Sequence, residues 1–319
     1  MQFKPIVFIL CVLFVACSPV IAQEKKDRKA DKQRVDAKDL PTCDRKLIYK
    51  TVESKSFQLH LFEAGPNATG TDLPSNDNRA AIVFFFGGGW NSGDPKQFYS
   101  QCRALADLGM VAMSAEYRVA SRDQSKVIDC ISDAQDAIAF VRNHAAELKI
   151  DPNRIAAGGG SAGGHLAAAV ATLDYRGTQK GRSKADYRPN ALVLFNPALI
   201  LAPTGSELDR DVERIGNLAE RIGDKPESAS PFHHLSNDLP PTIIFHGKAD
   251  TTVPYSTVKL FQDKATMLGC DCRLLGYEGE GHGFFNQGRP KYFETRDAMI
   301  AFLSELNYCP SVYSPSVKK

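Results

Sequence analysis

The chain has 319 residues, of which 43% are hydrophobic, so it can bury the core of one large domain or two small ones. Its 39 lysines and arginines nearly balance 37 aspartates and glutamates, and the formal net charge is +2. A charge this close to neutral argues against nucleic acid or an anionic membrane surface as a partner.

The N-terminal segment, residues 1–22, has the pattern of a cleaved secretory signal: one lysine, an apolar run over residues 6–16 and a small residue at Ala22. That run is shorter than the roughly 20 residues that cross a bilayer, so we expect no stable membrane span. The protein is then expected to be secreted or periplasmic. An alternative is a lipid anchor on Cys17, because residues 14–17 loosely resemble a bacterial lipobox.

Residues 23–42 mix charges of both signs and contain almost nothing to bury, which predicts a flexible segment. The folded domain is therefore expected over residues 43–319. It opens with two apolar-polar alternations, 47–51 and 57–62, which predict antiparallel strands at the edge of a sheet. Beyond a turn-forming stretch, the unbroken apolar run 80–86 predicts a strand that is covered on both faces.

The rest of the chain alternates between helical and extended patterns. The expected order is helix 98–108, strand 110–117, helix 127–148, strand 154–157, helix 165–172, strands 191–195 and 242–245, helix 256–268, strand 272–277 and helix 296–306. This alternation is typical of an α/β fold with a mostly parallel sheet, here eight-stranded and flanked by helices. Residues 203–231 are polar and partly helical, which predicts a small insertion over the strand ends.

Six cysteines remain beyond residue 22, and an even count in an exported protein predicts disulfide bonds. They are Cys43, Cys102, Cys130, Cys270, Cys272 and Cys309. Cys270 and Cys272 are not expected to join each other, because residues two apart on a strand are separated by nearly 7 Å. If the last helix returns antiparallel to the strand that Cys270 opens, Cys309 comes close to that opening. The pairing stays open, and Cys102 and Cys130 are alternatively two buried apolar residues. No Cys/His spacing resembles a zinc site.

The strongest chemical signal is the stretch Gly159-Gly160-Ser161-Ala162-Gly163, which matches G-x-S-x-G between an expected strand and an expected helix. Such a turn is so tight that the serine takes a strained backbone conformation and its hydroxyl projects above the sheet. A glycine-rich turn with an ordinary serine is the alternative. The context favours a nucleophile.

A serine nucleophile needs a base, because its hydroxyl is weakly nucleophilic at neutral pH. His282 lies in a glycine-rich loop between the last expected strand and the last expected helix, and Asp250 follows another expected strand end. Ser161, Asp250 and His282 therefore occur in the order nucleophile, acid and base, each on a loop after a strand. The other histidines are expected to have structural roles: His60, His144, His165, His233, His234 and His246.

The strand at 80–86 runs directly into three glycines and the only tryptophan, Trp90. Glycines at a strand end can present backbone N–H groups to a developing oxyanion without side chains in the way. We expect Gly88 and Gly89, together with Ala162, to form an oxyanion hole.

Five blocks in this order resemble one known family: FGGGW, AEYRV, IDPNRIAAGGGSAGG, LPPTIIFHGKADTTVP and GEGHGF. The chain resembles the α/β-hydrolase superfamily, in its HGGG/GxSxG esterase-lipase group, which includes hormone-sensitive lipases and bacterial acetyl- and feruloyl-esterase-like proteins. The resemblance covers about residues 80–306. It implies the α/β-hydrolase fold and a carboxylic ester hydrolase with Ser161, Asp250 and His282 as its triad.

Two positions depart from that group. Its histidine before the glycines is Phe86 here, so Trp90 or phenylalanine packing is expected to hold the loop instead. The acidic residue that often precedes the serine is Gly160. Both changes favour the secreted carbohydrate-type esterases over the lipase-like members of the group.

The sequence thus predicts a secreted serine esterase that acts on short-chain acyl esters, with carbohydrate-linked acetyl or feruloyl esters as candidate substrates. It implies no metal and no organic cofactor, and the expected partner is a small-molecule or carbohydrate ester. The same triad would also serve an acyltransferase or a serine peptidase, and a non-catalytic binding module of this fold is a further alternative. The oligomeric state is left open.

Overall fold

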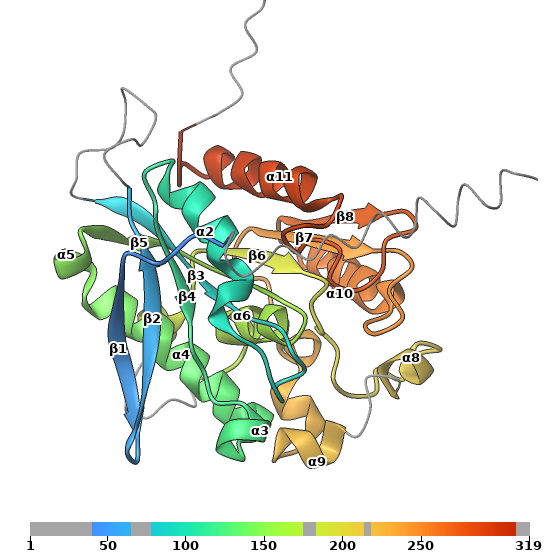
Figure 1. Ribbon diagram of the computed structural model, residues 1–319. Coiled ribbons are helices and arrows are strands. Elements are labelled where there is room, and N and C mark those ends of the chain that lie inside the picture. Colours follow the sequence, from blue (N-terminus) through green and yellow to red (C-terminus); the bar gives the residue numbers. More distant parts are fainter. Residues whose placement is uncertain (1–39, 65–77, 175–182, 214–217, 311–319) are drawn as a thin grey trace, which may run out of the picture. The chain divides into compact units, whose positions relative to one another are not determined.

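The structure, a computed structural model, describes residues 40–64, 78–174, 183–213 and 218–310 (Figure 1). The chain divides into two compact units, residues 1–34 and 35–319, and every described residue belongs to the second unit. The expected secretory signal, Cys17 and all but the last residues of the charged segment 23–42 lie outside the described residues. Within the described ranges, no helix has the length and apolar character needed to span a membrane.

Eight strands form a single sheet in the order β1-β2-β4-β3-β5-β6-β7-β8. Their bounds are β1 Arg45–Val52, β2 Lys55–Phe62, β3 Arg79–Phe85, β4 Val111–Ala115, β5 Ile150–Gly160, β6 Ala191–Phe195, β7 Thr242–Gly247 and β8 Cys272–Tyr277. The pairs β1/β2 and β2/β4 are antiparallel, and all other neighbouring pairs are parallel. The prediction of a mostly parallel eight-stranded sheet with two antiparallel edge strands is confirmed.

Helices lie between the strands along the chain, as a parallel sheet requires. The longer ones are α2 Tyr99–Ala106, α4 Val127–Asn143, α6 Ala162–Thr172, α10 Tyr255–Met267 and α11 Tyr292–Glu305. The short ones are α3 Ala120–Asp123, α5 Ala145–Leu148, α7 Lys184–Tyr187, α8 Asp209–Glu213 and α9 Leu218–Ile222, with the 3-10 turns η2 Pro95–Phe98, η3 Pro226–Ala229 and η4 Pro231–His234.

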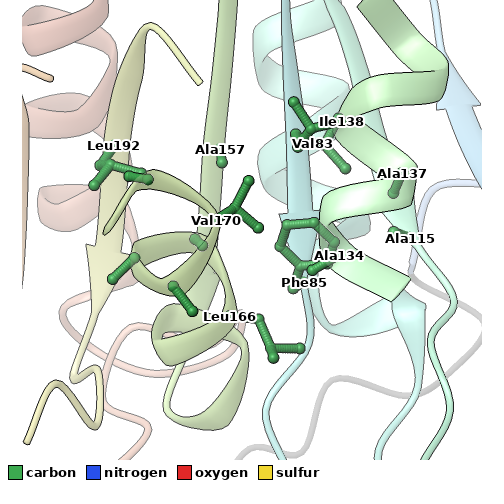
Figure 2. Packing of buried hydrophobic residues seen from close by; sticks show 14 of the residues in the cluster. Val83, Phe85, Ala115, Ala134, Ala137, Ile138, Ala157, Leu166, Val170 and Leu192 are labelled. Carbon is green, nitrogen blue, oxygen red and sulfur yellow. The ribbon is translucent and has the colours of Figure 1, made fainter. Parts of the chain in front are cut away.

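Both faces of the sheet are buried, and this explains why the central strands read as unbroken apolar runs. On one face, Val83 and Phe85 of β3 pack with Leu166 of α6 and Ile138 of α4, as Figure 2 shows. On the other face, the alternate residues of the same strands pack against α2 and α11. Successive side chains of β3 therefore pack into two separate cores, one on each face of the sheet. The loops that follow the strands lie at the edge of the sheet formed by the strand ends.

The long helix predicted at 127–148 is broken in two at His144. The imidazole Nδ1 lies 2.8 Å from the carbonyl oxygen of Phe140, and its ring stacks on the Phe140 ring. The backbone N–H of His144 donates to the same carbonyl at 3.0 Å, and its backbone at φ −101° and ψ 20° leaves the helical conformation, so α4 ends there and α5 supplies a short second piece. Lys149, at φ 56°, then turns the chain into β5.

The prediction of disulfide bonds is not met: all six cysteines beyond residue 22 are free thiols. Cys309 packs in the core on the α2 and α11 side of the sheet, whereas Cys272 packs in the core on the opposite side. The sheet itself therefore separates Cys309 from the strand opening that it was expected to reach. Cys102 and Cys130 are fully buried in opposite cores, and burial raises the pKa of both thiols. The alternative interpretation of these two as buried apolar residues fits.

The insertion expected at 203–231 contains α8, α9 and η3, and its described residues include no strand. Lys126, at the start of α4, holds this insertion, because its Nζ donates to the carbonyl oxygen of Glu220 at 2.9 Å. In Figure 1, α9 accordingly lies close to α3 and the first turn of α4.

Candidate active site

Ser161 occupies the single-residue turn between β5 and α6. Its backbone is at φ 53° and ψ −117°, a conformation that L-residues rarely adopt. Its N–H donates to the carbonyl oxygen of Phe195 at 2.8 Å, and its own carbonyl accepts from the N–H of His165 at 2.9 Å. The strained turn is thus fixed on both sides by backbone hydrogen bonds, as expected for a residue whose conformation is imposed by its surroundings.

The structure brings Ser161, His282 and Asp250 together in one hydrogen-bonded chain. The Ser161 Oγ lies 2.9 Å from His282 Nε2, and His282 Nδ1 lies 2.7 Å from Asp250 Oδ2. These residues follow β5, β8 and β7 respectively, three parallel strands whose carboxyl ends share one edge. The geometry allows the imidazole to take the serine proton while the carboxylate holds the other ring nitrogen.

Asp250 is buried but well supplied with donors. The N–H groups of Thr252 and Val253 donate to its Oδ1 at 2.8 and 3.0 Å. Burial raises the pKa of the Asp250 carboxyl, but the hydrogen bonds from His282, Val253 and Thr252 outweigh it and leave the pKa below its usual value. Asp250 is therefore ionised at neutral pH and can stabilise a protonated His282.

His246 also approaches Asp250, with Nε2 3.4 Å from Oδ2. The same nitrogen lies 2.8 Å from the carbonyl oxygen of Val253, to which it donates. The side chain is fully buried, and burial lowers its pKa to about 4. A neutral, buried imidazole held by a backbone carbonyl has the structural role that the sequence predicts for it.

The glycine loop after β3 lies beside this chain of side chains. Gly88 and Gly89 have φ 125° and 63°, and a Cβ on Gly88 would lie 2.2 Å from the carbonyl oxygen of Ser92. Within the part of the chain that the structure describes, the N–H groups of Gly88 and Gly89 make no hydrogen bond. Gly89 and Ala162 line a cavity of about 160 Å³ together with Ser161, whereas Gly88 does not line it.

The glycine loop is braced by a side chain that the sequence does not single out. The Gly87 N–H donates to Gln97 Oε1 at 2.6 Å, and Gln97 Nε2 donates to Asn286 Oδ1 at 3.0 Å. Asn286 Nδ2 in turn donates to the carbonyl oxygen of Gly283 at 2.8 Å, next to His282. One amide-to-amide link therefore ties the glycine loop to the histidine loop.

The expectation that aromatic packing holds this loop also agrees with the structure. The Phe86 ring stacks on Tyr117 at 4.1 Å, and the Tyr117 hydroxyl donates to the Phe86 carbonyl oxygen at 2.6 Å. Trp90 Nε1 donates to Nδ1 of the buried His165 at 3.1 Å, and His165 Nε2 donates to the Ala229 carbonyl oxygen at 2.7 Å. Burial lowers the pKa of His165 to about 4, so the imidazole is neutral and links the glycine loop to the insertion by hydrogen bonds alone.

We expect Gln97→Leu to lower kcat for 4-nitrophenyl acetate about tenfold with KM little changed. The substitution leaves the Gly87 N–H without its acceptor, so the loop loses its fixed position relative to Ser161. Steady-state kinetics would show the change, with Gln262→Leu on α10 as the matched control. An equal loss in both variants, or a rise in KM alone, would contradict a positioning role for Gln97.

Sequence reasoning missed Gln97 and Asn286, because neither belongs to a recognisable motif, and it gave no separate role to Tyr117, although this residue lies in the AEYRV block. It also gave no role to Arg221 of the insertion, which lines the cavity at Ser161. In the described ranges, no group of three or more His, Cys, Asp or Glu side chains is arranged to hold a metal ion.

Comparison with known proteins adds to this geometry. The BD-FAE family matches residues 72–265, a range that includes Ser161 and Asp250 and ends before His282. The probable carboxylic ester hydrolase LipM of Mycobacterium tuberculosis is 32% identical over 74% of this chain and 56% of its own length. The acetylxylan esterase of Xylanibacter ruminicola is 26% identical over 82% of this chain and 52% of its own length. The chain thus spans about half the length of the curated relatives it matches.

A solved structure matches this chain over most of its length. The apo form of Thermogutta terrifontis esterase 2 is 43% identical, with a TM-score of 0.77, over 86% of this chain and 98% of that protein. The eight-stranded sheet with helices on both faces is therefore the α/β-hydrolase fold. On the match over residues 72–265 and this likeness to an esterase, the chain belongs to the BD-FAE family, within the esterase/lipase group of the α/β-hydrolases.

Proposed function

We propose that the protein hydrolyses short-chain carboxylic esters through an acyl-enzyme on Ser161. The observation that carries this proposal is the chain of contacts from Ser161 Oγ to His282 Nε2 at 2.9 Å and from His282 Nδ1 to Asp250 Oδ2 at 2.7 Å. The names of the relatives as a carboxylic ester hydrolase and an acetylxylan esterase agree with it.

In the first half-reaction, Ser161 Oγ attacks the ester carbonyl carbon while His282 Nε2 takes the hydroxyl proton. Negative charge builds on the carbonyl oxygen, and the N–H groups of Gly88, Gly89 and Ala162 are the proposed donors to it. Ala162 is the first residue of α6, so its N–H has no partner inside the helix. Asp250 stabilises the imidazolium that forms.

The tetrahedral intermediate then collapses, and His282 gives its proton to the departing alcohol oxygen. Water attacks the acyl-enzyme carbonyl with His282 again as the base, and His282 then gives that proton to Ser161 Oγ as the bond to the acid product breaks. Each proton accepted by His282 is returned within the same half-reaction, so the cycle needs no cofactor to balance it.

The proposed acyl group is short. The cavity at Ser161 measures about 160 Å³, below the roughly 300 Å³ at which pockets for drug-sized ligands begin. Acetylated carbohydrate is a candidate substrate, supported by the similarity to the acetylxylan esterase of Xylanibacter ruminicola. We place the activity outside the cytoplasm, because residues 1–22 have the pattern of a secretory signal.

The test is a series of 4-nitrophenyl esters from acetate to palmitate, with Ser161→Ala as the blank. We expect kcat/KM to be highest for acetate to butyrate and to fall at least tenfold by octanoate, because the longer chains exceed the cavity. Release of acetate from acetylated xylan, measured on the same preparation, addresses the carbohydrate substrate. Rates that increase toward palmitate would contradict the short-chain assignment, and equal rates with the Ser161→Ala blank would contradict the mechanism.

A further inference from the structure

A second and larger cavity lies beside the proposed active site. It measures about 520 Å³ and shares Gly89, Trp90 and Arg221 with the smaller cavity at Ser161. Its remaining wall comes from the glycine loop, from α3, from α4 with the loop before it, and from α9: Asn91, Ala120, Ser125, Lys126, Val127 and Glu220. Three shared residues make the two cavities neighbours, and Arg221 is one of the residues that line both.

Arg221 is held in place without a carboxylate. Its guanidinium donates to the carbonyl oxygen of Gly89 and lies 5.2 Å from the centroid of the Trp90 ring. Among the described residues, no Asp or Glu side chain forms an ion pair with it. Its side chain is partly buried, and burial lowers its pKa from the usual value, although an arginine stays charged at any physiological pH.

A second cation stands at the same cavity. Lys126 lines it and uses its Nζ to hold the Glu220 carbonyl of α9, next to Arg221. The one acidic side chain of the lining, Glu220, is exposed. Lys126 is exposed as well, so these two opposite charges offset each other and the partly buried Arg221 supplies the excess positive charge of the wall.

The neutral alternative for the occupant is a sugar or aromatic ring stacked on Trp90. The Arg221 guanidinium already covers one face of the Trp90 ring, so a sugar or aromatic ring cannot stack on that face. What the shared wall offers is a planar cation with N–H donors beyond the one used on Gly89. Such a group binds a carboxylate in preference to a neutral group of the same size.

Resting on the proposed esterase function, we propose that the larger cavity binds the alcohol half of the ester and that Arg221 selects alcohols carrying a carboxylate. The smaller cavity then takes the short acyl group beside Ser161. An ester seated in this way points its negatively charged group at Arg221, a partly buried cation that lines both cavities.

The test compares two acetates that differ only in charge, 3-carboxy-4-nitrophenyl acetate and 3-carbamoyl-4-nitrophenyl acetate. We expect Arg221→Gln to lower the ratio of their kcat/KM values, carboxylate over carboxamide, about tenfold. Arg221→Lys is expected to retain part of the preference, and added salt to weaken it in the wild type. Intrinsic reactivity cancels, because the same ratio is compared between variants.

Arg210→Gln is the matched control, since Arg210 is an exposed arginine of α8 that lines neither cavity. We expect its ratio to equal that of the wild type, which excludes a general effect of net charge. If Arg221→Gln slows both esters equally, Arg221 acts only on the Gly89 loop, and the proposal is overturned.

Binding of the alcohol product, 5-hydroxy-2-nitrobenzoate, gives a readout that does not depend on catalysis. Calorimetry is expected to show about tenfold weaker binding to Arg221→Gln than to the wild type. Intact binding without hydrolysis of either acetate would overturn the proposed function and leave the role of Arg221 standing. Equal binding to both proteins would overturn the role of Arg221 alone.

Discussion

Ser161→Ala is expected to lower kcat for 4-nitrophenyl acetate by about 10⁵- to 10⁶-fold, the scale seen when a serine nucleophile is removed. The substitution removes the oxygen that lies 2.9 Å from His282 Nε2 and so removes the proposed acyl-enzyme. The proposed oxyanion donors at Gly89 and Ala162 remain, which leaves a residual rate above that of water.

The double variant Ser161→Ala/His282→Ala tests whether the two side chains act as one unit. If Ser161 and His282 act as one unit, His282→Ala added to Ser161→Ala should cost almost nothing more. Urea unfolding of each variant checks that the loss is chemical. A double variant that falls far below both single variants, or Ser161→Ala that keeps more than about 1% of the wild-type kcat, would point to a second nucleophile.

Ser161→Gly separates the chemistry from the strain. Glycine adopts a backbone at φ 53° far more readily than serine, so this variant is expected to lose activity while it gains about 1 kcal/mol of unfolding free energy. The gain would identify the turn at Ser161 as a place where stability is given up for function.

The parts of the site that could be predicted are those with a local signature. Ser161 is marked by its glycines, and Asp250 and His282 by their positions after strands in a fixed order. The strands themselves follow from apolar runs, because a sheet covered on both faces needs no polar alternation. Each of these inferences uses residues that are close in the sequence.

The parts that could not be predicted depend on contacts between distant segments. Gln97 and Asn286 are 189 residues apart, and nothing near either of them indicates that they meet. Arg221 lies in a polar insertion that lacks a motif. The disulfide prediction failed for a related reason: counting cysteines does not show which face of the sheet each one occupies.

Gly163→Ala is expected to destabilise the protein strongly, by about 3 kcal/mol or more. Helix propensity alone predicts a gain in stability instead, because Gly163 is the second residue of α6 and alanine is favoured over glycine in a helix by about 1 kcal/mol. A Cβ at this position would lie 1.9 Å from the carbonyl oxygen of Phe85 and 2.5 Å from that of Phe86. These are backbone atoms of β3 and of the glycine loop, so they cannot move aside as a flexible side chain would.

The clash outweighs the helix propensity, so the substitution lowers the free energy of unfolding. It is also expected to affect catalysis, because α6 must move away from the end of β3. That movement separates Ala162 from the glycine loop, so a folded remnant of Gly163→Ala should have a reduced kcat. Gly281→Ala is the matched control: its added Cβ meets nothing within 4 Å and its φ is not positive. Equal urea midpoints for the two variants would show that α6 and β3 can separate without loss of stability. The close approach of these two backbones would then not be the cause of the tight strand-to-helix turn at Ser161.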